Sequence, residues 1–170
     1  MGGKVSLGNG DKFKGKMVNN KKEGKGTYYF KDGSVYDGDF HNDLMEGKGT
    51  YKFKNGGKYT GDFKNDKMDG KGVYTFKNGD KYEGDFKEDK MNGKGVLTKK
   101  TGDKYVGDFV NGLPDGEGVF TYAAGHKYEG HFKAGKKHGH GVETYVDGFC
   151  YDGEWKNDEK VKKWKFIKIC

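Results

Sequence analysis

The 170-residue chain contains no arginine, so all of its basic side chains other than histidine are lysines. Proteins that read DNA sequence rely on the arginine fork to recognise base edges, and this chain lacks that fork. The lysines are concentrated at the two ends: residues 1–31 hold eight against two acids, and residues 156–170 hold six against two. The middle of the chain is slightly acidic, so the sequence predicts no nucleic-acid partner.

Cysteine and long apolar runs are also scarce. Cys150 and Cys170 are the only cysteines, and they form neither a CxxC pair nor a disulfide-scaffold spacing. This favours a reducing, cytoplasmic setting. No stretch approaches the roughly 20 apolar residues of a membrane-spanning helix, and the N-terminus has no apolar signal-peptide region. The sequence therefore predicts a cytoplasmic protein, with peripheral attachment as its route to a membrane.

Hydrophobic residues make up only 31% of the chain and charged residues 35%, a balance that is typical of disordered segments. However, 12 Tyr, 12 Phe and 2 Trp are far too many for a solvated coil, and they accompany 32 glycines and a single proline. The apolar material is therefore aromatic and is spaced by small residues. This composition predicts a thin, layered core.

A repeat of 23 residues fills most of the chain. An aromatic residue followed two positions later by glycine recurs at Phe13, Tyr36, Tyr59, Tyr82, Tyr105, Tyr128 and Tyr151. When the leading aromatic is position 1, position 3 is glycine in all seven repeats and position 5 is Phe in five of them. A Gly-x-Gly pair occupies positions 12 and 14 in six repeats, and another glycine follows at position 21. A period of this size indicates an array of one supersecondary unit.

Within a repeat, YTGDFK and GKGVYTF alternate with period two, which predicts two short strands. The pieces KNG, KDG and VDG are predicted hairpin turns, whereas NDKMD is predicted to be a looser loop. If KNG is a three-residue loop with a bulge, positions 16, 14 and 12 face positions 1, 3 and 5 of the next repeat. Large rings then lie over glycines on one face. We therefore predict an all-β fold, an elongated single-layer antiparallel β-meander built of about seven 23-residue β-hairpin repeats.

The recurring Y-x-G-(D/E)-(F/W), followed by G-x-G and (D/N)-G, resembles the MORN (membrane occupation and recognition nexus) repeat family. The resemblance implies a non-enzymatic scaffold or adaptor that binds partner proteins in cytoskeletal, axonemal (ciliary) or membrane-associated assemblies. It also implies a cytoplasmic location associated with the cytoskeleton or an axoneme. On this basis the chain divides into an N-terminal segment (1–12), a repeat array (13–155) and a basic C-terminal capping strand (156–170).

The aromatic face of the array is the candidate partner-binding surface. A helix or an extended segment of a partner protein would lie in a groove along this face. The candidate contact residues, beside the rings at positions 1 and 5, are Tyr51, Phe53, Tyr74, Phe76, Phe120, Tyr122 and Tyr145. The same rings would hold the sheet together, and we expect them to have both roles.

The N-terminus predicts a contact with membranes. Its first residues, MGGKVS, fit the acceptor pattern for myristoylation of Gly2, and several lysines follow within 20 residues. Since one acyl chain holds a membrane only marginally, the lysines would supply the second, electrostatic signal. The alternative function is therefore a peripheral membrane protein that binds anionic phospholipids, and a chance match to the pattern is the simpler alternative.

The last residues, VKKWKFIKIC, have the composition of a strand that is rich in lysine. Lysines protect an exposed sheet edge from further pairing. Alternatively, the apolar residues Trp164, Phe166, Ile167 and Ile169 form an edge contact that makes a homodimer through an end strand.

Residues that could support catalysis are few. No catalytic pair stands out, and a repeated motif rarely encodes a single active site, so we expect no enzymatic activity and no cofactor. On the polar face, His131 and His140 fall in a row with Glu117 and Glu154. Such a row is a candidate for a divalent metal or for a pH sensor. Ordinary polar substitution on an exposed surface is the simpler interpretation, so no metal is predicted.

Overall fold

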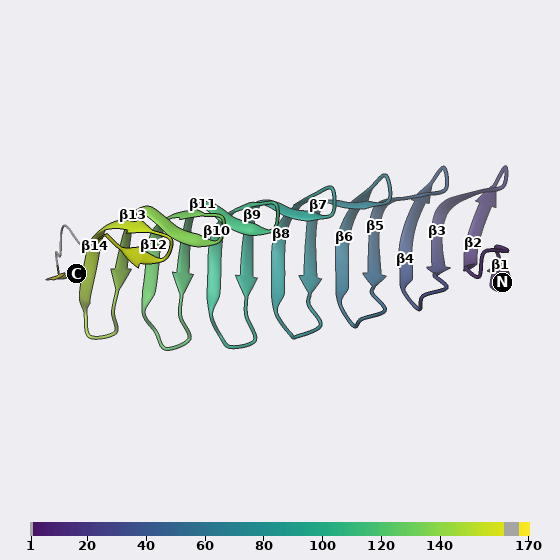
Figure 1. Cartoon of the computed structure of the whole chain (residues 1–170). Helices are drawn as coiled ribbons and strands as arrows, with labels where there is room; N and C mark the ends of the chain where they lie inside the picture. The colour runs from purple at the N-terminus through teal and green to yellow at the C-terminus, as the bar shows by residue number, and fades with distance from the viewer. Residues whose placement is uncertain (1, 162–166) are drawn as a thin grey trace. The chain divides into compact units, whose positions relative to one another are not determined.

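The computed structural model of the chain describes residues 2–161 and 167–170, which form β-strands and turns (Figure 1). The strands follow one another in sheet order from β1 to β15 as an open antiparallel meander, and β16 pairs with β14. No helix in the described part of the chain is long and apolar enough to cross a membrane. The predicted all-β meander of 23-residue hairpin repeats is therefore confirmed.

The strands form two compact units. The first unit comprises Met1–Gly79 with Asp85–Lys90, and the second comprises Asp80–Gly84 with Met91–Cys170, so β8 (Lys81–Lys87) contributes to both. The other strands of the first unit are β1 (Val5–Ser6), β2 (Lys12–Val18), β3 (Lys21–Tyr29), β4 (Val35–His41), β5 (Leu44–Lys52), β6 (Lys58–Lys64) and β7 (Lys67–Thr75). The other strands of the second unit are β9 (Lys90–Thr98), which begins at the unit boundary, β10 (Lys104–Val110), β11 (Leu113–Thr121), β12 (Lys127–Lys133), β13 (Lys136–Thr144), β14 (Phe149–Lys156), β15 (Glu159–Lys160) and β16 (Ile167–Ile169).

The two turns of each repeat differ in length. The K-D-G and K-N-G turns place their glycine in the left-handed region, as at Gly56 (φ 101°), in agreement with the sequence. The N-D-K-M-D piece, in contrast, is not a loose loop. Asn65 and Asp66 (φ 49° and 67°) form a two-residue turn, and residues 67–69 already belong to β7. Asn and Asp tolerate positive φ, which a two-residue turn of type I′ requires at both central positions.

The two-residue turns also join each repeat to the one before it. The carboxylate of Asp66 accepts a hydrogen bond from the Met45 N–H (2.8 Å), and the Asp66 N–H donates to the Met45 carbonyl (3.1 Å). Asp43 makes the same two bonds to Lys22. The aspartate of this turn is therefore a structural connector between repeats, which explains why it recurs in a segment that otherwise resembles a solvated loop.

The cross-strand register agrees with the prediction from the glycine pattern. Between β5 and β6, Tyr51 faces Tyr59 and Gly49 faces Gly61, which are positions 16 to 1 and 14 to 3. Position 12 likewise faces position 5. Directly opposed residues of an antiparallel pair point to the same face. The rings and the glycines of the repeat therefore share one face of the sheet.

The core consists of the rings at positions 1 and 5. Tyr59 is 0% exposed, and its ring meets Phe63 (centroids 5.1 Å apart) and Phe86 (4.9 Å) at nearly perpendicular angles. This edge-to-face arrangement is favoured by the quadrupoles of aromatic rings. Since Phe63 belongs to the same repeat and Phe86 to the next, each tyrosine packs between two repeats. The glycines leave the space into which these rings fit.

The tyrosine hydroxyl explains the aspartate that follows in the motif. The register of β6 and β7 shifts between Gly61 and Phe63, which places Asp62 in a bulge that disrupts the ladder. The Tyr59 hydroxyl donates a hydrogen bond to the carbonyl of Asp62 (2.7 Å). Equivalent bonds join Tyr36 to Asp39, Tyr105 to Asp108 and Tyr128 to His131. Tyr-x-Gly-Asp thus encodes a ring, the space beside it and a capped bulge.

A disulfide fastens the C-terminal strand. Cys150 in β14 is fully buried and is bonded to Cys170, with a Cα–Cα distance of 5.9 Å, within the usual range for a disulfide. The Cys170 N–H also donates to the carbonyl of Gly148 (3.1 Å). This corrects the expectation drawn from the cysteine spacing. The pairing of β16 with β14 brings the two cysteines together, and their spacing in the sequence does not reveal that pairing.

Candidate functional site

A second series of rings, at positions 16 and 18, lies on the aromatic face of the first unit. Tyr28, Phe30, Tyr51, Phe53, Tyr74 and Phe76 form a continuous series of contacts that we call the aromatic ladder. Successive centroids are 4.6, 5.4, 4.6, 5.5 and 4.6 Å apart, with the ring planes tilted by 42–53°. All six side chains are partly exposed, unlike the buried rings at position 1. The ladder is therefore an aromatic surface that a second molecule can contact.

Four of the candidate residues from the sequence, Tyr51, Phe53, Tyr74 and Phe76, lie next to one another in this ladder. Sequence reasoning missed Tyr28 and Phe30, which extend it by one repeat. The signal was present, because these two residues lie 23 positions before Tyr51 and Phe53. A binding role for the ladder residues stays a prediction.

The ladder is electrically neutral at physiological pH. Burial raises the pKa of the Tyr51 and Tyr74 hydroxyls above the usual value near 10. Burial also raises the pKa of Tyr28, and so does the hydrogen bond that its hydroxyl donates to the Asp11 carboxylate (2.6 Å). The surface thus offers ring faces and edges, without a charge of its own, to whatever contacts it.

The second unit differs at the corresponding positions. In chain order, its residues at positions 16 and 18 are Leu97, Lys99, Phe120, Tyr122, Glu143 and Tyr145. Phe120 and Tyr122 are in contact, with centroids 4.7 Å apart. Tyr145 is reached only through His126, which stacks on Tyr122 at 4.0 Å and lies 6.5 Å from Tyr145. The three candidates from this unit therefore form a shorter series, in which a histidine takes the place of a ring.

An ion pair occupies the same face of the second unit. Position 10 is methionine in the second, third and fourth repeats but Lys137 in the sixth. The Lys137 ammonium lies 3.0 Å from Glu143 and within 5.3 Å of the rings of Tyr122, Tyr128 and Trp155. Although burial acts to lower it, hydrogen bonds to Tyr122 and Glu143 raise the pKa of Lys137. The second unit therefore fills with its own charges a surface that is neutral in the first unit.

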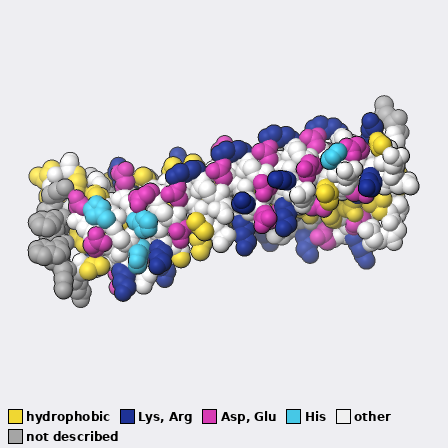
Figure 2. Space-filling model, turned by 90° about the horizontal axis from the view of Figure 1, so that it is seen from above, with side chains coloured by type: hydrophobic (Ala, Val, Ile, Leu, Met, Phe, Trp, Pro, Cys, Tyr) yellow, Lys and Arg dark blue, Asp and Glu magenta, His cyan; other side chains and the backbone are white. Residues whose placement is uncertain are grey.

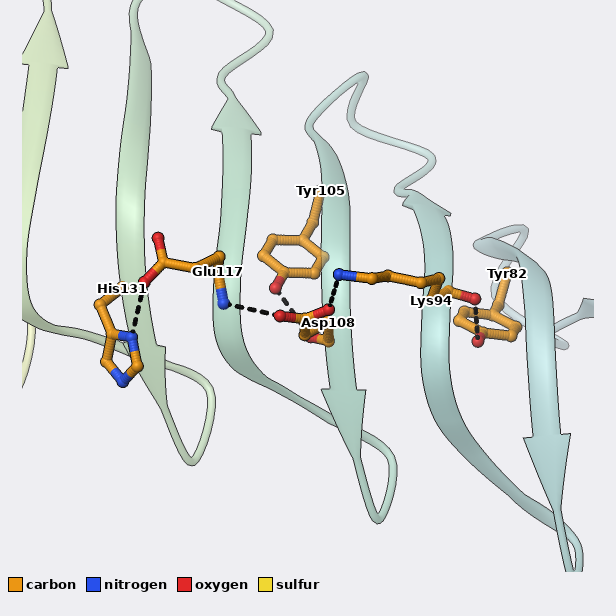
Figure 3. A network of polar contacts seen from close by, with 6 residues as sticks. All are labelled: Tyr82, Lys94, Tyr105, Asp108, Glu117 and His131. Carbon is orange, nitrogen blue, oxygen red and sulfur yellow. Dashed lines mark hydrogen bonds and ion pairs between the residues drawn. The ribbon is translucent and has the colours of Figure 1, made fainter.

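The opposite face carries charges of both signs, as Figure 2 shows for the surface seen from above. Within each unit, a lysine at position 13 pairs with the bulge aspartate of the next repeat, as Lys94 does with Asp108 (Figure 3). Asp108 also accepts a hydrogen bond from the Glu117 N–H (2.9 Å). One strand further, the pair is reversed: Glu117 takes the place of lysine and lies 2.9 Å from His131. Glu117 and His131 are therefore explained as members of this series of cross-strand pairs.

The metal candidate from the sequence is not assembled. His131 contacts Glu117, but His140 points its Nε2 at Asp152 (2.7 Å) instead of joining His131 and Glu154. The register of β12 and β13 shifts at His131, so the two histidines do not form the regular pair that the alternation predicts. Residues 2–161 and 167–170 contain no group of three or more side chains arranged to hold a metal.

The ion pairs of the polar face predict a loss of stability in acid. Hydrogen bonds from Lys25, Lys48 and Lys94 hold the pKa of Asp39, Asp62 and Asp108, respectively, below the usual range. A carboxylate with a lowered pKa stabilises the fold above its unfolded pKa of about 3.9, and this contribution is lost as the pH falls through the folded pKa. We expect the free energy of unfolding, measured in urea, to be flat from about pH 7 to 5 and to fall below about pH 4.

The matched variant carries Asp39→Asn, Asp62→Asn and Asp108→Asn together. Its unfolding free energy should depend less on pH between about 4 and 2 than that of the unaltered chain, because three of the linked protons are gone. An unchanged pH dependence in this variant would show that the pairs do not contribute to acid sensitivity.

The two ends carry the remaining sequence predictions. Gly2 is exposed and has no neighbour within 4 Å of an added Cβ, and its acylation stays a prediction. The nearby Lys4 ammonium lies over the Tyr29 ring at 3.8 Å. Trp164 and Phe166 lie outside the described residues. The backbone of Ile167 pairs with Tyr151 of β14, and Ile169 is 81% exposed.

Seven segments of the chain match the family model described as the MORN repeat: residues 13–35, 36–58, 59–81, 82–104, 105–127, 128–149 and 151–161. No curated protein sequence matches the chain. Among solved structures, the chain is similar to the SAS-4 (dCPAP) TCP domain of Drosophila melanogaster, in complex with a proline-rich motif of Ana2 (dSTIL). Identity is 12%, the match covers 89% of this chain and 83% of that one, and the TM-score is 0.54.

A point mutant of the TCP10 domain of Danio rerio CPAP matches at 14% identity, over 90% of this chain and 83% of that one, with a TM-score of 0.28. At 12% identity, the likeness to the Drosophila domain concerns the fold alone.

Proposed function

Because the chain belongs to the MORN repeat family, a family of protein-interaction scaffolds, we propose that it is a non-enzymatic scaffold whose aromatic ladder binds an extended, proline-rich segment of a partner protein. The observation that carries the proposal is the ladder itself. Six neutral, partly exposed rings contact one another in series over three repeats of the first unit. Such a surface exceeds what the fold needs, because the rings at positions 1 and 5 already form the core.

The chemistry of the ladder favours a proline-rich occupant. Proline-rich segments adopt the polyproline II helix before they bind, so they lose little entropy, and they dock on surfaces lined with aromatic rings. The Drosophila TCP domain, which shares the fold, is in complex with a proline-rich motif. These two considerations favour an extended segment over the helical one that the sequence also allowed. A cytoskeletal or axonemal assembly as the setting is part of the proposal and rests on the family.

The test is the binding of a neutral proline-rich peptide, fluorescently labelled (Pro-Pro-Ser)5, to the full chain. The variant Tyr74→Ser/Phe76→Ser removes two ladder rings, and we expect the affinity, measured by fluorescence anisotropy, to fall about tenfold or more, as expected for aromatic hot spots. The matched control, Val73→Ser/Thr75→Ser, alters the same strand on the opposite face and should leave the affinity unchanged. Equal affinities of the ladder variant and the unaltered chain, with both folded, would refute the proposed site.

A further inference from the structure

A row of lysines follows the aromatic ladder of the first unit. Lys31, Lys54 and Lys77, which we call the rim lysines, come directly after the ladder residues at position 18. They stand at the tips of the K-D-G and K-N-G turns, and the turns after β3, β5 and β7 follow one another along one edge (Figure 1). Each side chain passes over the turn of the preceding repeat: an added Cβ at Gly56 would lie 3.8 Å from Cγ of Lys77. The fold thus places one cation beside the ladder in every repeat.

The rim lysines have no ion-pair partner within the described residues. All three are exposed, and no ion pair joins them to a described acid, whereas the lysines of the polar face are paired with aspartates. The acids nearest in sequence have other partners. Asp11 accepts hydrogen bonds from the Tyr28 hydroxyl (2.6 Å) and the Lys31 N–H (2.7 Å), and Asp32 accepts one from Ser34 (2.8 Å). Three positive charges therefore remain to be balanced beside a neutral aromatic surface.

The spacing of the repeats matches one type of backbone. Two strands of a sheet advance about 9.6 Å, at about 4.8 Å per strand, so ladder and lysine recur at this interval. A polyproline II helix has three residues per turn and rises about 3.1 Å per residue, which gives about 9.3 Å. A two-residue step of a β-strand gives about 6.7 Å, and a heptad of an α-helix gives about 10.5 Å. A polyproline II segment can therefore present the same face to three successive repeats with the smallest mismatch.

We propose that the aromatic ladder and the rim lysines together select a proline-rich segment that carries an acidic residue at every third position. Prolines would pack on the rings while each third side chain, on the lysine side, meets Lys31, Lys54 or Lys77. This inference rests on the proposed function and adds to it the charge and the register of the partner. Lys77 is the most informative of the three, because the residue equivalent to Asp32 in the turn before it is the uncharged Asn55.

The experiment compares labelled (Pro-Pro-Glu)5 with (Pro-Pro-Lys)5 on the full chain by fluorescence anisotropy. We expect the glutamate peptide to bind at least tenfold more tightly at low salt, with a smaller difference at high salt, because ions screen exposed charges. The variant Lys31→Glu/Lys54→Glu/Lys77→Glu should reverse the preference, and Lys77→Glu alone should reduce it. The matched control, Lys12→Glu/Lys52→Glu/Lys58→Glu, changes the net charge equally on exposed residues of the opposite face and should retain the preference for glutamate.

The outcomes separate this inference from the proposed function. Equal affinities of the two peptides, both lost in Tyr74→Ser/Phe76→Ser, would overturn the role of the rim lysines and leave the binding face intact. Equal effects of the two lysine triple variants would also overturn it, since the attraction would then be unspecific. Tighter binding of an acidic, alanine-rich helical peptide would overturn the polyproline register. Binding of every peptide that does not depend on the ladder rings would instead refute the proposed function itself.

Discussion

The substitution Gly72→Ala is expected to lower the free energy of unfolding by about 3 kcal/mol, in the upper range for overpacked cores. The backbone at Gly72 does not have the positive φ that alanine avoids, so the obstacle is steric. A Cβ there would lie inside the ring of Tyr59, which is fully buried between Phe63 and Phe86 and cannot move aside. The ring would have to leave its two edge-to-face contacts and its hydrogen bond to Asp62.

The control for this prediction is Gly57→Ala in the turn that precedes β6. The nearest atom to a Cβ at Gly57 is the Tyr74 hydroxyl at 3.3 Å, and the equivalent position of the preceding repeat already carries a side chain, Ser34. Its effect should therefore stay within about 0.5 kcal/mol. Urea denaturation measures both variants, with the midpoint shifting and the slope unchanged. Equal stabilities of the two variants would mean that the ring-over-glycine packing is not what holds the repeat.

A similar loss is expected for Lys137→Met in the second unit. Lys137 and Glu143 form an ion pair whose side chains are only 12% and 11% exposed. Removal of one partner from a buried pair costs about 3 kcal/mol or more, because the other charge is left without compensation. The variant should therefore unfold at a lower urea concentration, even though methionine is the residue of the second, third and fourth repeats at this position.

The double variant Lys137→Met/Glu143→Leu separates the pair from its surroundings. Leu97 already occupies the position of Glu143 in the fourth repeat, so the double variant restores residues that the fold accepts elsewhere. Replacing both charges by apolar groups of similar volume is often neutral or stabilising, and we expect stability within about 1 kcal/mol of the unaltered chain. If the double variant were as unstable as Lys137→Met alone, the packing of the Lys137 side chain, rather than its charge pair with Glu143, would account for the loss.

The sequence predicts the strands and their register because the rule that sets them is local and recurs. Tyr59 can lie over Gly72 only in one pairing, and the same requirement is repeated every 23 residues. The two-residue turn at Asn65 and Asp66 was mistaken for a loop because its polar composition was considered before the preference of Asn and Asp for positive φ. Tyr28 and Phe30 were missed although the period points to them.

Features that occur only once were harder to predict. The bond between Cys150 and Cys170 depends on the pairing of β16 with β14, which no repeated signal specifies. The direction of the His140 side chain, toward Asp152, depends on a local choice of rotamer beside a bulge. The stacking of His126 on Tyr122 became visible only in the structure, because Glu143 leaves the place that a ring occupies in other repeats.

The two units therefore differ in function on our account. The first keeps its aromatic ladder neutral and uninterrupted, whereas the second interrupts the series with Leu97 and Lys99 and occupies its face with the Lys137–Glu143 pair. A proline-rich partner should therefore engage the first unit in preference to the second. This difference lets a single binding experiment test the account, because the second unit provides an internal comparison.

The most direct measurement is a set of intermolecular nuclear Overhauser effects between (Pro-Pro-Glu)5 and the full chain, with the aromatic side chains isotopically labelled. The account predicts contacts from proline ring protons to Tyr51, Phe53, Tyr74 and Phe76, and weaker or no contacts to Phe120 and Tyr122. Contacts confined to the polar face, or to the rings of the second unit alone, would contradict the claim that the ladder of the first unit is the binding surface.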